Sequence, residues 1–314
     1  MTRVSKTELL HPWKITGFID AEGSFVVTIV KDTKRTSGYN VTVLFEIGLN
    51  SSDKLLLTRI KNTLGAGNIY YKASDNTYRW KISNIDDLVN VIIPHLKKYP
   101  LLTQKRADFE LFTKIVEIMQ NKGHTTIEGL QQIINLKASL NLGLSDKLKA
   151  DFPNTEQVPR PKVSISRIPD PNWIAGFASG EACFFISIYK SEKSKLKLAV
   201  QLVLKITQHS RDRELLKSIK DYFSCGRVEN RKTEACDFTV NSFKSFNEII
   251  IPFFEEYKIE GIKYTNYEYF KEIVEIMRIK GHLIPEGLER IKEIKSCTRR
   301  AFGPAGKMNN YENI

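Results

Sequence analysis

One apolar stretch occurs twice in this sequence, and it limits the possible folds more than any other feature. The first copy runs from Ile15 to Phe25 and the second from Ile174 to Phe184. A proline stands shortly before each copy, where a helix tolerates it because the missing N–H would have no partner. We therefore expect each copy to form a short helix that leads into a strand. Each apolar run ends at a charge after roughly ten residues, which is too short to cross a membrane.

Small residues four positions apart give each predicted helix a flat stripe. Gly17 and Ala21 form the stripe of the first copy, and Gly176 and Gly180 form that of the second. Two such stripes that face each other let the helix backbones approach closely. The pattern therefore predicts that the two helices pack side by side.

Each copy ends in a single carboxylate, Glu22 in the first and Glu181 in the second. In a parallel pair both acids would lie at the C-terminal ends, where each helix carries a partial charge of about −0.5. Two carboxylates in such a place either raise one pKa strongly or recruit a cation, and an all-oxygen environment suits Mg²⁺ or Ca²⁺. The alternative is that two packing helices happen to end in surface glutamates. One copy alone would favour that alternative, but two matched copies favour the cation site.

The duplication extends far beyond the two helices. The two glutamates are 159 positions apart (22 and 181), Gly67 and Gly226 repeat that spacing, and His124 matches His282 at a spacing of 158. A period of this size is longer than a solenoid repeat and indicates a domain duplication. With 314 residues the chain is long enough for two such units.

The predicted domains are residues 1–150, a proline-rich extended linker at 151–171, residues 172–303, and a poorly ordered tail at 304–314. Within the first repeat we expect strands at 24–30 and 39–49, a helix at 51–64, strands at 68–72 and 77–83, and helices at 85–97, 105–122 and 127–140. Within the second we expect strands at 183–189 and 196–208, a helix at 211–223, strands at 226–230 and 236–241, and helices at 245–257, 264–280 and 285–299.

The charge balance points to a polyanionic partner. The net charge is +12, with basic residues spread through the chain, and the hydrophobic fraction of 41% supports a real core. Nucleic acid is favoured over a membrane surface, although structural RNA-binding proteins share this charge. The four cysteines have neither CxxC nor zinc-ligand spacing and are interpreted as reduced thiols. Without a signal-like N-terminus or a membrane span, we expect a protein that is intracellular or made inside an organelle.

One face of each predicted four-stranded sheet is basic and polar. A β-ribbon fits the major groove of DNA, and such side chains can contact base edges there; the alternative is a solvated lysine-rich face. The candidate DNA-binding residues of the first repeat are Thr28, Lys31, Lys34, Arg35, Tyr70, Lys72, Arg79 and Lys81. Those of the second repeat are Lys190, Lys193, Lys195, Lys197, Gln201, Lys205, Arg227, Asn230, Arg231 and Lys232.

The two motif copies, Ile15–Gly23 and Ile174–Ala182, resemble those of the LAGLIDADG homing endonucleases, specifically the single-chain type of fungal mitochondrial introns. The resemblance covers nearly the whole chain. It implies an α+β fold of two αββαββα repeats related by a pseudo-twofold axis, with parallel motif helices at the domain interface and two saddle-shaped antiparallel sheets that straddle DNA. It also implies a mitochondrial monomer that binds a long, imperfectly palindromic duplex and hydrolyses both strands with Mg²⁺, leaving short 3′ overhangs. We expect Ca²⁺ to support binding with little cleavage.

The resemblance assigns roles to residues of this chain. Glu22 and Glu181 would be catalytic metal ligands, aided by the carbonyls of Ala21 and Gly180. Further polar residues of the cleavage site would be Gln201, Gln208, Lys105 and Lys263.

The sequence departs from the family motif at two positions of the second copy. Ser179 stands where the first copy has Asp20, a position expected to be structural. Ala182 stands where the first copy has Gly23, and its methyl group could crowd an approaching phosphate or metal.

Two other functions remain open on the same fold. One is a maturase, an RNA-splicing cofactor that binds intron RNA and does not depend on the carboxylates. The other is a DNA-binding protein that has lost its nuclease activity, against which the two intact acids argue.

Overall fold

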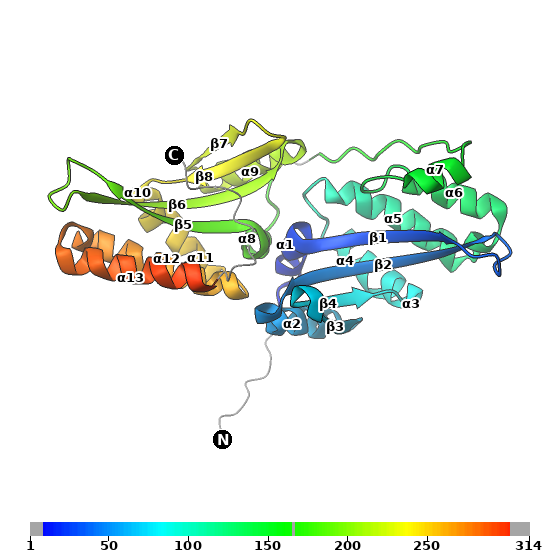
Figure 1. Cartoon of the computed structure of the whole chain (residues 1–314), viewed down its shortest axis with the longest axis horizontal. Coiled ribbons are helices and arrows are strands. Elements are labelled where there is room, and N and C mark those ends of the chain that lie inside the picture. Colours follow the sequence, from blue (N-terminus) through cyan, green and yellow to red (C-terminus); the bar gives the residue numbers. More distant parts are fainter. Residues whose placement is uncertain (1–8, 165–166, 302–314) are drawn as a thin grey trace, which may run out of the picture. The chain divides into compact units, whose positions relative to one another are not determined.

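The computed structural model describes residues 9–164 and 167–301 (Figure 1). The chain divides into two compact units, residues 1–180 and residues 181–314, and each is described by itself. The predicted tail at 304–314 lies outside the described residues. None of the helices within the described ranges is both long enough and apolar enough to span a bilayer.

The first unit is built on an antiparallel sheet with the strand order β1-β2-β4-β3. Its strands are β1 (Gly23–Lys31), β2 (Tyr39–Asn50), β3 (Asn68–Lys72) and β4 (Thr77–Ile82). The buried residues of β1 and β2 alternate with exposed or half-buried ones, as expected for a sheet with one covered face. The two predicted hairpins are therefore present.

The helices of this unit follow the predicted order. They are α1 (Pro12–Glu22), α2 (Lys54–Leu64), α3 (Ile85–Asp87), α4 (Ile93–Lys98), α5 (Lys105–Gln120), α6 (Ile127–Lys137), α7 (Asp146–Asp151) and α8 (Pro171–Glu181). The helix predicted at 85–97 contains a π-helical segment, Leu88–Ile92, just before Pro94, whose missing N–H disturbs regular hydrogen bonding. The sequence pattern did not predict α7, a helix of six residues with Ser145 as its N-cap.

The core of the first unit lies between the sheet and its helices. Phe25 of β1 contacts Phe45 of β2 and also Phe109 and Phe112 of α5, with ring centroids 5.2, 5.5 and 5.3 Å apart. All four rings are buried. Since α5 packs against β1, and α2 against β2 and β4, one face of the sheet is covered and the opposite face is left open.

The linker is bound to the first unit by hydrogen bonds. Residues 152–164 form neither helix nor strand, and Arg160 connects them to the first unit. Its two terminal nitrogens donate to the two carboxylate oxygens of Asp108 at 2.7 and 2.8 Å, and to the carbonyls of Ser139 and Gln104 at 3.0 Å each. A bidentate arginine–carboxylate pair at a largely buried aspartate holds the linker in one conformation.

The second unit repeats this architecture with the strand order β5-β6-β8-β7. Its strands are β5 (Ala182–Lys190), β6 (Leu198–His209), β7 (Arg227–Asn230) and β8 (Ala235–Val240). Its helices are α9 (Arg213–Phe223), α10 (Phe243–Ser245), α11 (Ile251–Glu256), α12 (Ile262–Arg278) and α13 (Pro285–Ala301). The α+β fold with two antiparallel sheets is therefore present as predicted.

Corresponding turns agree in detail between the units. Gly67 and Gly226 each precede the third strand with a φ of +79°, a left-handed conformation that favours glycine. Phe184 occupies the place of Phe25 and packs against Phe270 of α12, with ring centroids 5.3 Å apart. These matches follow from the shared register of the two repeats.

Candidate cleavage site and nucleic-acid interface

The motif helices α1 and α8 touch through their glycines. A Cβ atom on Gly17 would lie 2.1 Å from the carbonyl oxygen of Trp173, and one on Gly176 would lie 2.0 Å from that of Lys14. No side chain fits at those distances, so each glycine lets the backbones meet. The predicted stripe of small residues is the contact surface between the two helices.

The order of the contacts shows that the helices are parallel. Lys14 and Gly17, in the first half of α1, meet Gly176 and Trp173 in the first half of α8. Ala21 meets Gly180 near the two ends, where a Cβ on the glycine would lie 2.3 Å from that of the alanine. The same Cβ would lie 3.2 Å from an Oε1 oxygen of Glu22. The carboxylate of the first motif therefore lies beside the last turn of the second motif helix.

Asp20, the other acid of the first motif, is buried in a polar cage. Its carboxylate accepts hydrogen bonds from the backbone N–H of Leu102 (2.8 Å) and Thr103 (3.1 Å), the Thr103 hydroxyl (2.6 Å) and the Trp173 indole (2.8 Å). Burial raises the pKa of Asp20 above its usual value, although these hydrogen bonds act in the opposite direction. The carboxylate joins α1 to α8 and to the segment before α5, which is a structural role. In the second motif, Ser179 instead donates to Ala175 of its own helix at 2.7 Å.

Replacing this acid tests its structural role. Asp20→Asn puts an amide nitrogen where two N–H donors converge, so at least one buried donor loses its acceptor. We expect the free energy of unfolding to fall by about 1–3 kcal/mol, measured by urea denaturation. Asp146→Asn is the matched control, because the Asp146 side chain is fully exposed (100%). An Asp20→Asn protein as stable as the control would contradict this role.

Lys105, at the start of α5, lies against the C-terminal end of α1. Its Nζ donates to the carbonyls of Ile19 (3.0 Å), Asp20 (2.8 Å) and Ala21 (3.3 Å). The Ile19 carbonyl also accepts the backbone N–H of Gly23, so the ammonium group adds hydrogen bonds to the carbonyls of the last helical turn and opposes the partial negative charge there. Lys105, a predicted site residue, therefore contacts the residue next to Glu22, although the two segments are more than 80 positions apart in the sequence.

Lys263 holds the corresponding place in the second unit, as the second residue of α12. Desolvation raises the pKa of the Cys183 thiol, and the positive charges of Lys263 and Lys205 act in the opposite direction. Both lysines therefore lie near Cys183, which follows Glu181 by two positions.

The open face of the second sheet is hollowed into a groove of about 450 Å³ that begins at the motif glutamate. Three predicted residues, Gln201, Lys205 and Arg227, line it. The full lining is Glu181, Cys183, Phe185, Ser187, Gln201, Val203, Lys205, Thr207, Arg227, Glu229, Thr239 and Asn241. The groove joins one predicted catalytic acid to the predicted DNA-binding face.

Two predicted residues of this unit lie on the other face of their strands. Gln208 alternates with the groove residue Thr207 and shares the side of the buried Ile206. Asn230 accepts a hydrogen bond of 3.0 Å from Arg213 at the start of α9. The structure does not bring either side chain to the groove.

The other predicted basic residues of the second unit lie at strand ends and turns. Lys190 ends β5, and Lys193, Lys195 and Lys197 fall in the turn that follows it, where Lys197 pairs with Glu192 at 2.8 Å. Arg231 and Lys232 follow β7.

In the first unit the predicted residues fall on the open face of the sheet or at its tip. Thr28, Tyr70, Lys72, Arg79 and Lys81 alternate with the covered side chains of their strands, and Tyr70 lies opposite Arg79. Lys31 ends β1, while Lys34 and Arg35 lie in the β1–β2 turn.

Sequence reasoning missed acids on these open faces, among them Glu229, which pairs with Arg227 at 2.9 Å. Glu46 forms ion pairs with Arg79 and Lys81 at 3.3 and 3.4 Å, and Asp237 lies among Lys205, Arg231 and Thr207. Burial raises the pKa of Asp237, but the hydrogen bonds from Arg231 and Thr207 and the neighbouring positive charges outweigh it and hold the pKa below its usual value. The sequence signal that could have found these acids is their spacing: each lies an even number of positions from open-face residues of its own strand, and alternate residues of a strand share one face.

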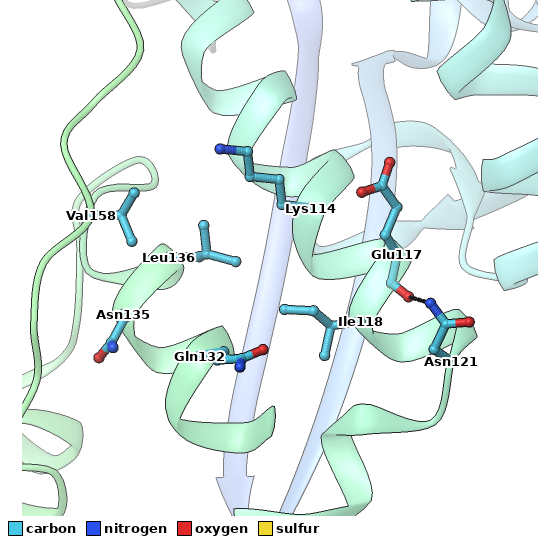
Figure 2. Close-up of a pocket in the computed structure, with 8 residues that line it drawn as sticks. All are labelled: Lys114, Glu117, Ile118, Asn121, Gln132, Asn135, Leu136 and Val158. Atoms are coloured by element: carbon cyan, nitrogen blue, oxygen red, sulfur yellow. Dashed lines mark hydrogen bonds between the residues drawn. The ribbon is translucent and has the colours of Figure 1, made fainter. Parts of the chain in front are cut away.

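A second hollow, of about 400 Å³, lies between α5, α6 and the linker (Figure 2). Ile118, Leu136 and Val158 form its apolar walls, and Lys114 and Glu117 stand at its rim. It is on the helical side of the first unit, away from the residues assigned to cleavage.

A family model described as LAGLIDADG endonuclease matches residues 15–116 and again residues 174–274. The chain belongs to this family. It is 42% identical over 312 residues to the probable intron-encoded endonuclease 2 of Neurospora crassa, covering 96% of this chain and 68% of that protein. It is 38% identical to the probable intron-encoded endonuclease 3 of the same fungus, of which it spans 54%.

Solved LAGLIDADG structures share the fold of this chain. The I-LtrWI homing endonuclease bound to target DNA is 53% identical, with a TM-score of 0.88 over 91% of this chain and 96% of that one. I-SmaMI bound to cleaved DNA is 40% identical, with a TM-score of 0.91 over 93% and 98%. Another I-SmaMI structure holds uncleaved DNA in the presence of calcium ions. The predicted family and fold are both confirmed.

Ala182, which replaces glycine in the second LAGLIDADG motif, is accompanied by a second difference four residues earlier. A Cβ on Gly23 would lie 2.7 Å from Cγ2 of Ile19, four residues earlier in α1. The residue four before Ala182 is Ala178, which has no Cγ2. The isoleucine side chain that would crowd a Cβ in the first copy is thus absent beside Ala182, although the carbonyl oxygen of Ile19, 2.8 Å from that Cβ, has a backbone counterpart in the second copy.

This local exchange predicts a small effect of removing that methyl group. Ala182→Gly should leave DNA binding unchanged and alter single-turnover cleavage by less than about tenfold, or ~1.4 kcal/mol. A much larger gain in rate would show that the methyl group displaces the phosphate or the metal ion.

The end of α1 has the oxygen ligands that a hard divalent cation prefers. Glu22 supplies a carboxylate close to Gly180, and the Ala21 carbonyl keeps a second lone pair beside its bond to Lys105. Mg²⁺ typically takes one or two protein carboxylates and completes its shell with water and phosphate. The residues present therefore fit Mg²⁺.

Proposed function

We propose that this chain is a monomeric, Mg²⁺-dependent homing endonuclease that cuts both strands of a long, imperfectly palindromic DNA duplex. The observation that carries the proposal is the backbone contact of two parallel motif helices, which puts Glu22 beside Gly180, the residue before Glu181. If the two motif glutamates were ordinary surface residues on helices that did not pack together, the helices would not need glycine at their contact points.

The chain's own residues have distinct tasks in this proposal. Glu22 and Glu181, with the carbonyls of Ala21 and Gly180, would hold the metal ions. When bound, these ions would activate water and stabilise the leaving 3′ oxygen. Lys105 holds the end of α1 in place and contributes a positive charge near the scissile phosphate.

The two repeats, residues 1–150 and 172–303, would each bind one half of the site. Their open sheet faces carry different side chains, so the half-sites should differ, with a total length of about 20 base pairs. On the same footing we propose a mitochondrial location, because the similar Neurospora proteins are named as intron-encoded. Binding to intron RNA stays a prediction.

The test is selection of bound duplexes from a randomised library in Ca²⁺, followed by cleavage of the selected duplex in Mg²⁺. We expect one protomer per duplex by sedimentation, a footprint of about two helical turns, and cuts in both strands. A dimer as the binding species, or a footprint of one turn, would contradict the proposal.

Salt dependence gives a further prediction. Many lysine and arginine contacts to phosphates release counterions, so the log–log slope of affinity against salt should be more negative than about −4. The measurement is equilibrium binding to the selected duplex at several KCl concentrations. A flat response would mean that the basic charge serves another purpose.

A further inference from the structure

On the open face of the first sheet, a carboxylate on an inner strand lies beside two cations on the next strand. Glu46 belongs to β2, whereas its partners Arg79 and Lys81 belong to β4. The N–O distances are 3.3 and 3.4 Å. The acid is therefore on β2 and the bases are on β4.

The second sheet has the same kind of cluster with the charges reversed. Asp237 belongs to β8 and lies 3.3 Å from Nζ of Lys205 on β6. Arg231 adds two hydrogen bonds of 2.9 Å from its Nε to the same carboxylate. Here the acid is on β8, which corresponds to β4, and a base is on β6, which corresponds to β2.

The two pairs occupy matched positions in the repeats. Glu46 and Lys205 are separated by the same 159 positions as the motif glutamates. Arg79 and Asp237 each lie opposite the residue two places further along the inner strand. Thus both members of the diagonal pair change sign between the units.

This reversal leaves the summed charge of the pair unchanged, since Glu46 with Arg79 and Lys205 with Asp237 each combine one acid and one base. It therefore has little effect on phosphate attraction, which depends on net charge. What changes is whether the side chain at the matched position accepts hydrogen bonds, as Glu46 does, or donates them, as Lys205 does. Both side chains are partly exposed, with fractions of 18% for Glu46 and 26% for Lys205; of the Glu46 carboxylate oxygens, Oε2 is buried.

The reversed position lies at the motif end of each sheet. Glu46 is opposite Ser24, and Lys205 is opposite Cys183, each two residues beyond its motif glutamate. Lys205 also lines the groove that contains Glu181. Base pairs over this position are therefore close to the cleavage point.

We propose that this reversed pair specifies a base pair at which the two half-sites must differ. Lys205 donates to guanine in one half-site, whereas Glu46 accepts from the N4 amino group of cytosine at the matched base pair of the other, the pairings these side chains favour in a major groove. This inference rests on the proposed function, because it requires duplex DNA on both open faces.

The central test exchanges the charges of one unit. The double variant Glu46→Lys with Arg79→Asp reverses the signs of this pair, as in the second unit, while preserving net charge. The new lysine lies opposite Lys81, whereas Lys205 lies opposite Thr239. Duplexes are selected from a randomised library in Ca²⁺ with wild type and variant. We expect wild type to select guanine and cytosine at the matched pair, and the variant to select guanine in both half-sites, by about tenfold or more over cytosine.

Two further variants keep the test decisive. Lys205→Glu with Asp237→Arg should move the other half-site from guanine to cytosine. Glu46→Gln is nearly isosteric and should shift the first half-site from cytosine towards adenine, the base that glutamine favours. The salt slope of the two charge-exchange variants should match wild type, because their net charge is unchanged.

The outcomes separate this inference from the proposed function. If wild type selects no duplex of any sequence, the proposed function fails and the inference falls with it. If wild type selects and cuts a site, but no variant changes the base at the matched pair, only the inference is overturned. A wild-type site that is palindromic at that pair would overturn it as well.

Discussion

In Mg²⁺, Glu22→Gln and Glu181→Gln are each expected to abolish double-strand cleavage while DNA binding persists. Each substitution keeps the shape of the side chain and removes one negative charge from the proposed metal site. Loss of a ligand that holds the ion should lower the single-turnover rate by about a thousandfold or more, or ~4 kcal/mol. Affinity for the selected duplex in Ca²⁺ should stay the same or rise, because an anion near the phosphates is gone.

The same variants have an effect on stability that a surface glutamate would not show. Each motif acid stands at a helix C-terminus, where the partial charge is also negative. Without metal, the melting temperature of either variant should rise slightly as this repulsion is relieved. Glu128→Gln makes the same chemical change at an exposed position in the first turn of α6 and should leave cleavage unaltered.

Two results would contradict the assignment in different ways. Cleavage that survives both substitutions would show that these glutamates are not catalytic. Loss of binding together with cleavage would show that they are structural, and that the motif helices are only a packing element.

Gly17→Ala is expected to give the largest loss of stability. The new Cβ would lie 2.1 Å from the Trp173 carbonyl oxygen and 2.8 Å from the Phe177 backbone nitrogen. Both neighbours are backbone atoms of a buried helix, so α1 and α8 must separate and disturb their packing. Overpacking of this kind should lower the free energy of unfolding by about 3 kcal/mol.

The matched control is another glycine of the first unit. A Cβ on Gly48 would meet only the Arg79 side chain, at 3.6 Å or beyond, which is ordinary contact. Gly48→Ala should therefore stay within about 0.5 kcal/mol of wild type in urea denaturation. If both variants were equally stable, the close approach of the helices would be wrong.

The sequence by itself determined the repeat and the strands, and it singled out Glu22 and Glu181 as candidate cleavage acids. Two copies of one motif at a constant spacing fixed the duplication, and the alternation of apolar residues fixed most strand positions. The small residues of the motif predicted helix contact because only a missing side chain allows backbones to meet. All of these signals are local in the chain and repeat, so they are readable without coordinates.

Only the tertiary structure decided which polar side chains meet. Gln208 and Asn230 have the right chemistry for a DNA-binding face, but near a strand end a shift of one residue moves a side chain to the other face. The contacts of Lys105 with the end of α1, and of Arg160 with Asp108, join segments more than 50 positions apart.

The reversed ion pairs show the same limit most clearly. Glu46 and Arg79 look like isolated charges in the sequence, and so do Lys205 and Asp237. Their pairing depends on the register between strands that are not consecutive in the chain, and that register is set by the packing of the whole sheet. The sequence determined which charges this protein has, and the sheet decided which of them face each other.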